Sequence, residues 1–163
     1  MHIDSRPIEP GKDGFAIGPV LLAEMTKAPY RPKAAGRIAF FFGPVAGALV
    51  TVVNLRRYGY PLKAKRVLSW TLLAAALLSV VLLLIPDVLS RVIGLIAEFT
   101  AYKVYSGLQE KEFEEWQTSH PDIEPRSGWG ALGWGVAGLL LFLGIIFAVG
   151  FALALFVPSA MPG

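Results

Sequence analysis

The chain has 163 residues, of which 55% are hydrophobic and only 17% are charged, and its formal net charge is +3. Soluble domains usually carry about 25% charged residues, so the composition argues against a soluble globular protein. The absence of cysteine excludes disulfides, thiolate metal sites and cysteine nucleophiles. The positive charge does not indicate nucleic-acid binding, because lysine and arginine beside apolar segments are explained by anionic lipid headgroups and by orientation during membrane insertion.

The first 37 residues are predicted to form a polar N-terminal tail. Its segment Phe15–Met25 is a short apolar patch, which suits the membrane interface but is too short to cross a bilayer. Acidic residues and the lack of an early apolar core argue against a cleavable signal peptide. Behind this tail we expect a membrane bundle over residues 38–157 and a C-terminal tail over 158–163.

Three long apolar runs dominate the rest of the chain. They are Ile38–Leu55, Val67–Ile85 and Trp129–Val157, and none contains Asp, Glu, Lys, Arg or His. A hydrocarbon core about 30 Å thick needs roughly 20 apolar helical residues to cross it. Each run therefore meets or approaches the length of a membrane-spanning helix. The predicted fold is all-α, an integral membrane helical bundle with three or four transmembrane helices.

Small residues recur every four positions in each run and predict close helix packing in lipid. This spacing places them on one helical face, where a second backbone can approach. The first run also contains Gly43-Pro44, where the missing backbone N–H is expected to kink the helix. The predicted helix-packing stripes are Ala39, Gly43, Gly47 and Thr51 in the first run, Thr71, Ala75 and Ser79 in the second, and Gly144, Ala148 and Ala152 in the last.

The loop between the first two runs is short and basic. Its simplest role is to set the orientation of the chain, and its cations are also candidates for contact with lipid headgroups. A phosphate-binding P-loop is excluded because the required glycine-rich Lys-Ser/Thr turn is missing. The candidate headgroup contacts are Arg56, Arg57, Lys63, Lys65 and Arg66.

Residues 87–105 allow two interpretations. They are long enough for a third span whose polar stripe faces the bundle, and they also fit an amphipathic helix on the membrane surface. Arg91 and Glu98 lie on one face of this segment and form a candidate intramembrane polar pair, either a salt bridge or part of an ion path. By the positive-inside rule, four spans favour both termini outside, and three spans favour a cytoplasmic N-terminus.

No catalytic, metal or cofactor site is apparent. His2 and His120 are the only histidines, and neither lies in an apolar run. The chain contains no HExxH, GxSxG or SxxK motif. We therefore predict that the protein is not an enzyme and that it holds no metal and no cofactor.

The segment Phe41-Phe42-Gly43-Pro44-Val45-Ala46-Gly47 is followed by Asn54 and by Gly59-Tyr60-Pro61 in a basic loop. Over about residues 38–68 this pattern resembles a loose group of small bacterial multi-pass membrane proteins with an F-x-G-P-x-A-G-like element in the first span. The resemblance implies a helical membrane fold and a location in the bacterial inner (cytoplasmic) membrane. It implies no activity.

Two functions fit these features. The first is a non-catalytic accessory or scaffold subunit of a larger membrane complex, because several helices carry packing stripes and one small bundle has few interior faces to use them. The second is a small homo-oligomeric channel or transporter, indicated by the Gly43-Pro44 kink and by Arg91 and Glu98. The expected partners are membrane lipids and other membrane protein subunits, with no nucleic acid.

Overall fold

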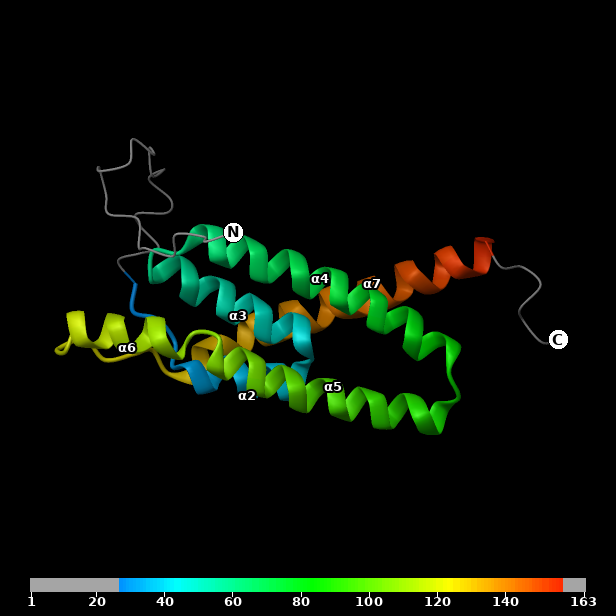
Figure 1. Cartoon of the computed structure of the whole chain (residues 1–163), viewed down its shortest axis with the longest axis horizontal. Helices are drawn as coiled ribbons and strands as arrows, with labels where there is room; N and C mark the ends of the chain where they lie inside the picture. Colours follow the sequence, from blue (N-terminus) through cyan, green and yellow to red (C-terminus); the bar gives the residue numbers. More distant parts are fainter. Residues whose placement is uncertain (1–26, 157–163) are drawn as a thin grey trace, which may run out of the picture.

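The computed structural model describes residues 27–156, and these form a bundle of helices (Figure 1). Within this range the only β-structure is a single bridge between Tyr30 and Arg126. The described chain is therefore all-helical, as predicted. The apolar patch Phe15–Met25 and the C-terminal tail lie outside it. The elements are α2 (Pro32–Phe42), α3 (Pro44–Arg57), α4 (Pro61–Leu84), α5 (Asp87–Gly107), α6 (Glu110–Ser119), the 3-10 turn η1 (Gly128–Ala131) and α7 (Leu132–Phe156).

The first apolar run does not form the single spanning helix predicted for 38–55. Helix α2 already begins at Pro32, within the expected tail, and ends at Phe42, and α3 then reverses direction and packs against it (Figure 1). Gly43 joins the two helices with φ +87° and ψ 168°, a conformation open essentially only to glycine. Pro44 follows as the first residue of α3, where its missing N–H costs nothing. Residues 32–57 are therefore a helical hairpin, not a kinked rod.

Helix α3 is the centre of the bundle. It contacts α2, α4, α5 and α7, and 11 of its 14 residues are buried. From Pro44 to Val53 its residues are small or apolar except for Thr51, which is the pattern of a helix surrounded by protein. At 1.5 Å per residue, α3 is about 21 Å long and α2 about 16 Å. Both are too short to cross a hydrocarbon core of about 30 Å.

Helix α4 and the helical segment Gly128–Leu155 are long and apolar enough to cross a membrane. Only 17% and 6% of the residues in their most apolar 18-residue stretches are buried, so they are not core helices of a soluble fold. Their outward faces carry Leu73, Leu77, Phe147 and Phe151. Length, composition and exposure together suggest a membrane location.

Helix α5 lies along the bundle. After the turn at Ile85-Pro86 it runs back beside α4 (Figure 1), and its most extensive contacts are with α2. The approach is close at Gly36, where an added Cβ would lie 2.8 Å from the carbonyl oxygen of Tyr102. Helix α5 is therefore packed into the bundle by its contacts with α2.

We expect Gly43→Ala to lower the free energy of unfolding by about 1–3 kcal/mol, because alanine must adopt a backbone conformation reserved for glycine. The cost is conformational, since the new Cβ would lie 3.6 Å from Phe142, an ordinary contact. Thermal or denaturant unfolding in detergent micelles measures the change. Gly133→Ala is the matched control, because this helical glycine faces open space; equal losses in both variants would contradict the role of Gly43.

Candidate functional site

Asn54 is the hub of a buried polar cluster where α3 ends. It is fully buried, and its side-chain oxygen accepts a hydrogen bond from the backbone N–H of Tyr30 at 2.8 Å. Its amide nitrogen donates to the carbonyl oxygen of Tyr30 at 2.9 Å and to the side-chain oxygen of Gln109 at 2.7 Å. Asn54 thus binds both backbone groups of Tyr30 as a neighbouring strand would, and it ties the segment before α2 to α3.

Gln109 continues the cluster toward α5 and α4. It too is fully buried, and its amide nitrogen donates to the carbonyl oxygen of Tyr105 at 3.0 Å and to the hydroxyl of Thr51 at 3.3 Å. The hydroxyl of Tyr105 shares a 2.7 Å hydrogen bond with that of Thr71 on α4. These hydrogen bonds connect α3, α5 and α4, with the link between Gln109 and Tyr105 made by the Tyr105 backbone.

Tyr30 is held from three sides. Its hydroxyl donates to the carbonyl oxygen of Gly130 at 3.0 Å. The backbone N–H of Arg126 donates to the carbonyl oxygen of Pro29, the residue before Tyr30, at 2.8 Å. The guanidinium of Arg57 lies 5.0 Å from the ring centroid and that of Arg126 lies 5.7 Å from it, within the range of cation–π attraction. Tyr30 therefore fastens the start of α7 to the end of α3.

Helix α6 covers the same end of the bundle. Phe113 and Trp116 pack against the apolar cluster formed around Leu55, and Lys63 of α4 forms an ion pair with Glu112. The hydroxyl of Tyr60 donates to Glu115 at 3.2 Å. Burial, with the nearby Glu115 carboxylate, raises the pKa of Tyr60 to about 12. Tyr60 is therefore a neutral donor at ordinary pH.

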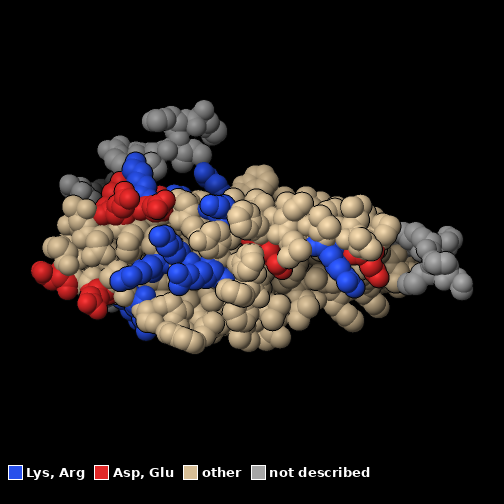
Figure 2. All heavy atoms as spheres, turned by 90° about the horizontal axis from the view of Figure 1, so that it is seen from below, with Lys and Arg blue, Asp and Glu red and all other residues tan. Residues whose placement is uncertain are grey.

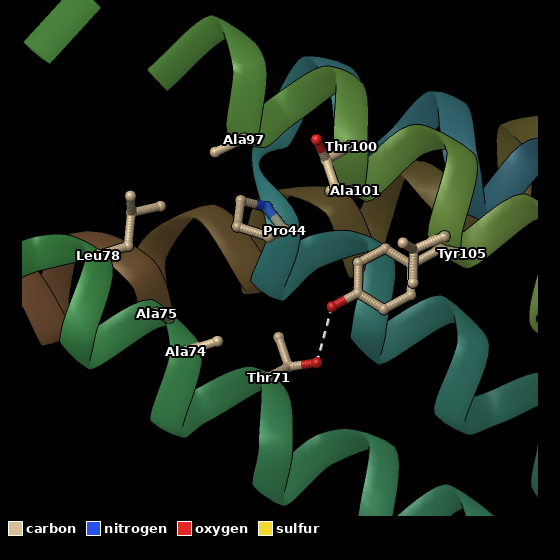
Figure 3. Close-up of a pocket in the computed structure, with 10 residues that line it drawn as sticks. Pro44, Thr71, Ala74, Ala75, Leu78, Ala97, Thr100, Ala101 and Tyr105 are labelled. Carbon is tan, nitrogen blue, oxygen red and sulfur yellow. Dashed lines mark hydrogen bonds between the residues drawn. The ribbon is translucent and has the colours of Figure 1, made fainter. Parts of the chain in front are cut away.

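An apolar cavity of about 330 Å³ lies beyond the tip of the hairpin (Figure 3). Pro44 closes one end, α4 forms one wall with Thr71, Ala74, Ala75 and Leu78, and α5 forms the other with Ala97, Thr100, Ala101, Val104 and Tyr105. Figure 3 shows the hydroxyls of Thr71 and Tyr105 bonded to each other beside this space. The cavity and the buried polar cluster therefore share Tyr105.

The first two predicted packing stripes lie in the interior. Thr71, Ala75 and Ser79 are three of the four buried residues of α4. Ala39, Gly43, Gly47 and Thr51 are also buried, but they do not share one helical face, because the chain reverses at Gly43. Instead Ala39 of α2 contacts Gly47 of α3 so closely that a Cβ on Gly47 would overlap it.

The third stripe is placed differently from the first two. Gly144, Ala148 and Ala152 are all exposed, and a Cβ added to Gly144 would meet nothing within 4 Å. The small residue that brings α7 against α3 is Gly138, where an added Cβ would lie 2.6 Å from the Ala46 backbone nitrogen. The predicted stripe on α7 is therefore exposed within the described chain.

Arg91 and Glu98 do not form a pair. Arg91 is exposed and Glu98 is half-buried on α5, and the salt bridges between described residues do not include one that joins them. The expectation of an intramembrane salt bridge between them is therefore not met.

The five candidate headgroup contacts separate into two groups. Arg56, Lys65 and Arg66 are exposed, whereas Arg57 is buried and donates to the carbonyl oxygen of Ala28 at 2.9 Å. Lys63 is engaged by Glu112 and by the Leu108 carbonyl oxygen. Among the described residues, three of the five thus remain exposed.

Sequence reasoning missed Tyr30, Tyr105 and Gln109 as members of a site. Gln109 stands next to an acidic, solvated stretch, and nothing in its neighbours signals burial. Tyr30 takes part through its backbone, which a residue pattern does not reveal. The one available signal was Asn54, a polar residue at the end of an apolar run.

The polar cluster and the cavity differ in what they leave open to a ligand. The described residues contain no group of three or more His, Asp or Glu side chains that could hold a metal ion. The polar cluster is occupied with internal hydrogen bonds, so the open cavity is the feature able to take a ligand. In comparisons with protein-family models, curated proteins and solved structures, the chain matches none of them.

We expect Asn54→Leu to lower the free energy of unfolding by at least about 2 kcal/mol, because leucine keeps the volume but leaves both backbone groups of Tyr30 buried without a partner. Denaturant unfolding in micelles measures the loss. Gln117→Leu on α6 serves as the matched control, since Gln117 is half-buried and has no side-chain hydrogen bond to the rest of the described chain. A loss no larger than that of the control would refute the role given to Asn54.

Proposed function

We propose that the protein is an integral membrane protein in which α4, α5 and α7 cross the bilayer. The hairpin α2–α3 enters from one side and returns to it. Three observations support this arrangement: the exposed apolar faces of α4 and α7, the length of α5, about 31 Å, and the short helices of the hairpin. Irregular backbone at membrane depth is tolerated where protein surrounds it, and Gly43 is buried. The resemblance of residues 38–68 favours the bacterial cytoplasmic membrane.

The charge distribution supports one orientation. Every Lys and Arg of residues 27–156 except Arg91 lies in or next to the half of the bundle that carries α6 and the loop between α3 and α4. Figure 2 shows the blue side chains gathered over that half on one face. Since Lys and Arg are retained in the cytoplasm, α6 and the start of α2 face the cytoplasm, and the turn at Ile85-Pro86 faces the opposite side.

Single cysteines test this topology cleanly, because the chain has none of its own. We expect Lys27→Cys, Arg56→Cys and Ser119→Cys to react with a membrane-impermeant thiol reagent only from the cytoplasmic side. Asp87→Cys should react only from the other side. Labelling of oriented vesicles with the cytoplasmic face outward, and of intact cells, measures the reaction from each side separately. Reaction of the cysteines at 27 and 56 from opposite sides would show that residues 32–57 cross the membrane once, and would overturn the re-entrant hairpin.

For the role of the protein, we infer a non-catalytic accessory or scaffold subunit of a larger membrane complex. The observation that carries this inference is the exposed stripe Gly144, Ala148 and Ala152 on α7. The equivalent stripe on α4 is buried inside the chain. In lipid, small residues at this spacing favour helix association because backbones approach closely. The stripe on α7 is therefore suited to a transmembrane helix of another subunit.

The tagged full chain should be extracted from its native membrane in a mild detergent, with particle mass and co-purifying chains measured together. We expect a stoichiometric membrane partner. Ala148→Leu should reduce partner recovery several-fold, because the larger side chain holds a helix away from the stripe. Ala154→Leu is the matched control, exposed on the same helix but outside the stripe. A monomeric particle without a partner would refute the proposal.

A small homo-oligomeric channel or transporter is the second candidate. The hairpin α2–α3 favours it, because broken helices that end near the middle of the membrane are common in transporters. The cavity at the hairpin tip has no charged residue in its lining, and Arg91 and Glu98 do not converge there. These features support an ion path less well than the exposed stripe supports a subunit.

A further inference from the structure

The cavity beyond the hairpin tip has the form of a small binding site. Its volume of about 330 Å³ is within the range of about 300–1,000 Å³ that is usual for ligand pockets. The space is left unfilled because many of the side chains that line it are small: Ala74 and Ala75 on α4, and Ala97 and Ala101 on α5. Pro44 marks where the hairpin ends between the two helices (Figure 3).

Three residues that line this cavity carry a hydroxyl, Thr71, Thr100 and Tyr105, and the two buried ones are incompletely paired. Thr71 and Tyr105 are 7% and 6% exposed, and their hydroxyls share one hydrogen bond. Two hydroxyls carry two donor protons, and one bond uses only one of them. Neither hydroxyl has another hydrogen bond within the described chain. One buried O–H donor beside the cavity is therefore left without an acceptor, which is costly away from water.

The residues that line the cavity also indicate that a bound ligand is uncharged and apolar. None of the ten lining residues is Asp, Glu, Lys, Arg or His, so the site offers nothing to balance an ionic group. The outer faces of α4 and α5 beside it carry exposed Leu77 and Leu95. A ligand reaching the cavity through these faces comes from the lipid phase and is itself apolar.

We propose that this cavity binds a neutral, membrane-soluble molecule with an apolar chain and an acceptor oxygen such as a carbonyl. The apolar chain lies against the alanines of α4 and α5, and the oxygen accepts the spare proton of the Thr71–Tyr105 hydroxyl pair. The proposal rests on the membrane location given above and is independent of any partner subunit. Two sources supply this chemistry: the acyl ester of a bilayer lipid, and a free lipophilic ketone or quinone.

Photolabelling of the full chain in lipid nanodiscs tests the site. The probe is a ten-carbon methyl ketone with a diazirine in its tail, and its comparison is the hydrocarbon of the same length with the same diazirine. We expect the ketone to label peptides of α4 and α5 that contain the lining residues. Unlabelled ketone should compete for this labelling. The hydrocarbon should need a concentration about five-fold higher than the ketone for the same reduction in labelling, which is the effect of one lost hydrogen bond.

Two kinds of variant measure separately how the shape of the cavity and its hydroxyl pair contribute to ketone binding. Ala97→Leu and Ala74→Leu fill the cavity from opposite walls and should reduce labelling at least five-fold, whereas Ala154→Leu on α7 should leave it unchanged. Tyr105→Phe combined with Thr71→Val removes both hydroxyls of the pair and keeps nearly the same side-chain volumes, so this double variant should raise the half-saturating ketone concentration about five-fold. Tyr102→Phe on the same helix is its control, since Tyr102 does not line the cavity.

The outcomes decide the proposal. Equal labelling of the wild type and both filled variants, or labelling confined to other helices, overturns the site. Equal competition by ketone and hydrocarbon overturns the role of the hydroxyl pair. Mass spectrometry of a solvent extract of the purified protein distinguishes the sources, because an ester lipid and a free ketone or quinone differ in mass. Depletion of that species in the Ala97→Leu variant supports the proposal for either source.

Discussion

The reversal at Gly43 is the constraint on which the rest of the structure depends. Its positive φ turns the chain back within the first apolar run, and Pro44 starts the next helix without a lost hydrogen bond. The reversal places α3 inside the bundle, in contact with four other helices. That position explains why 11 of its 14 residues are buried, and the buried polar ones, Thr51, Asn54 and Arg57, each form a hydrogen bond with another segment.

The all-helical fold was predictable from the long apolar runs, and the hairpin was not. The spacing of Ala39, Gly43, Gly47 and Thr51 fits one face of a continuous helix. The same small residues also serve a hairpin, in which Ala39 meets Gly47 across the interface. Periodicity does not distinguish these two structures. Only the backbone conformation at Gly43 does, and glycine before proline permits both a kink and a reversal.

The buried polar cluster could not be predicted for a different reason. Asn54 and Gln109 are 55 residues apart, and the main partner of Asn54 is the backbone of Tyr30. Backbone groups are common to all residues, so a hydrogen bond to one of them cannot be predicted from the pattern of residue types. The Gly144–Ala148–Ala152 stripe shows a second limit of prediction from sequence. Its spacing predicts a packing face, but whether the partner belongs to the same chain depends on where α7 lies.

The charge asymmetry and the cavity both follow from the short hairpin. Because α2 and α3 turn back together, the basic segments before and after them meet at one end of the bundle. Because they are shorter than α4 and α5, they fill only part of the space between those helices. In water, such an apolar gap would favour collapse of its walls. In lipid that driving force is absent, so α4 and α5 can remain apart beyond Pro44, and an apolar molecule from the bilayer can complete the packing.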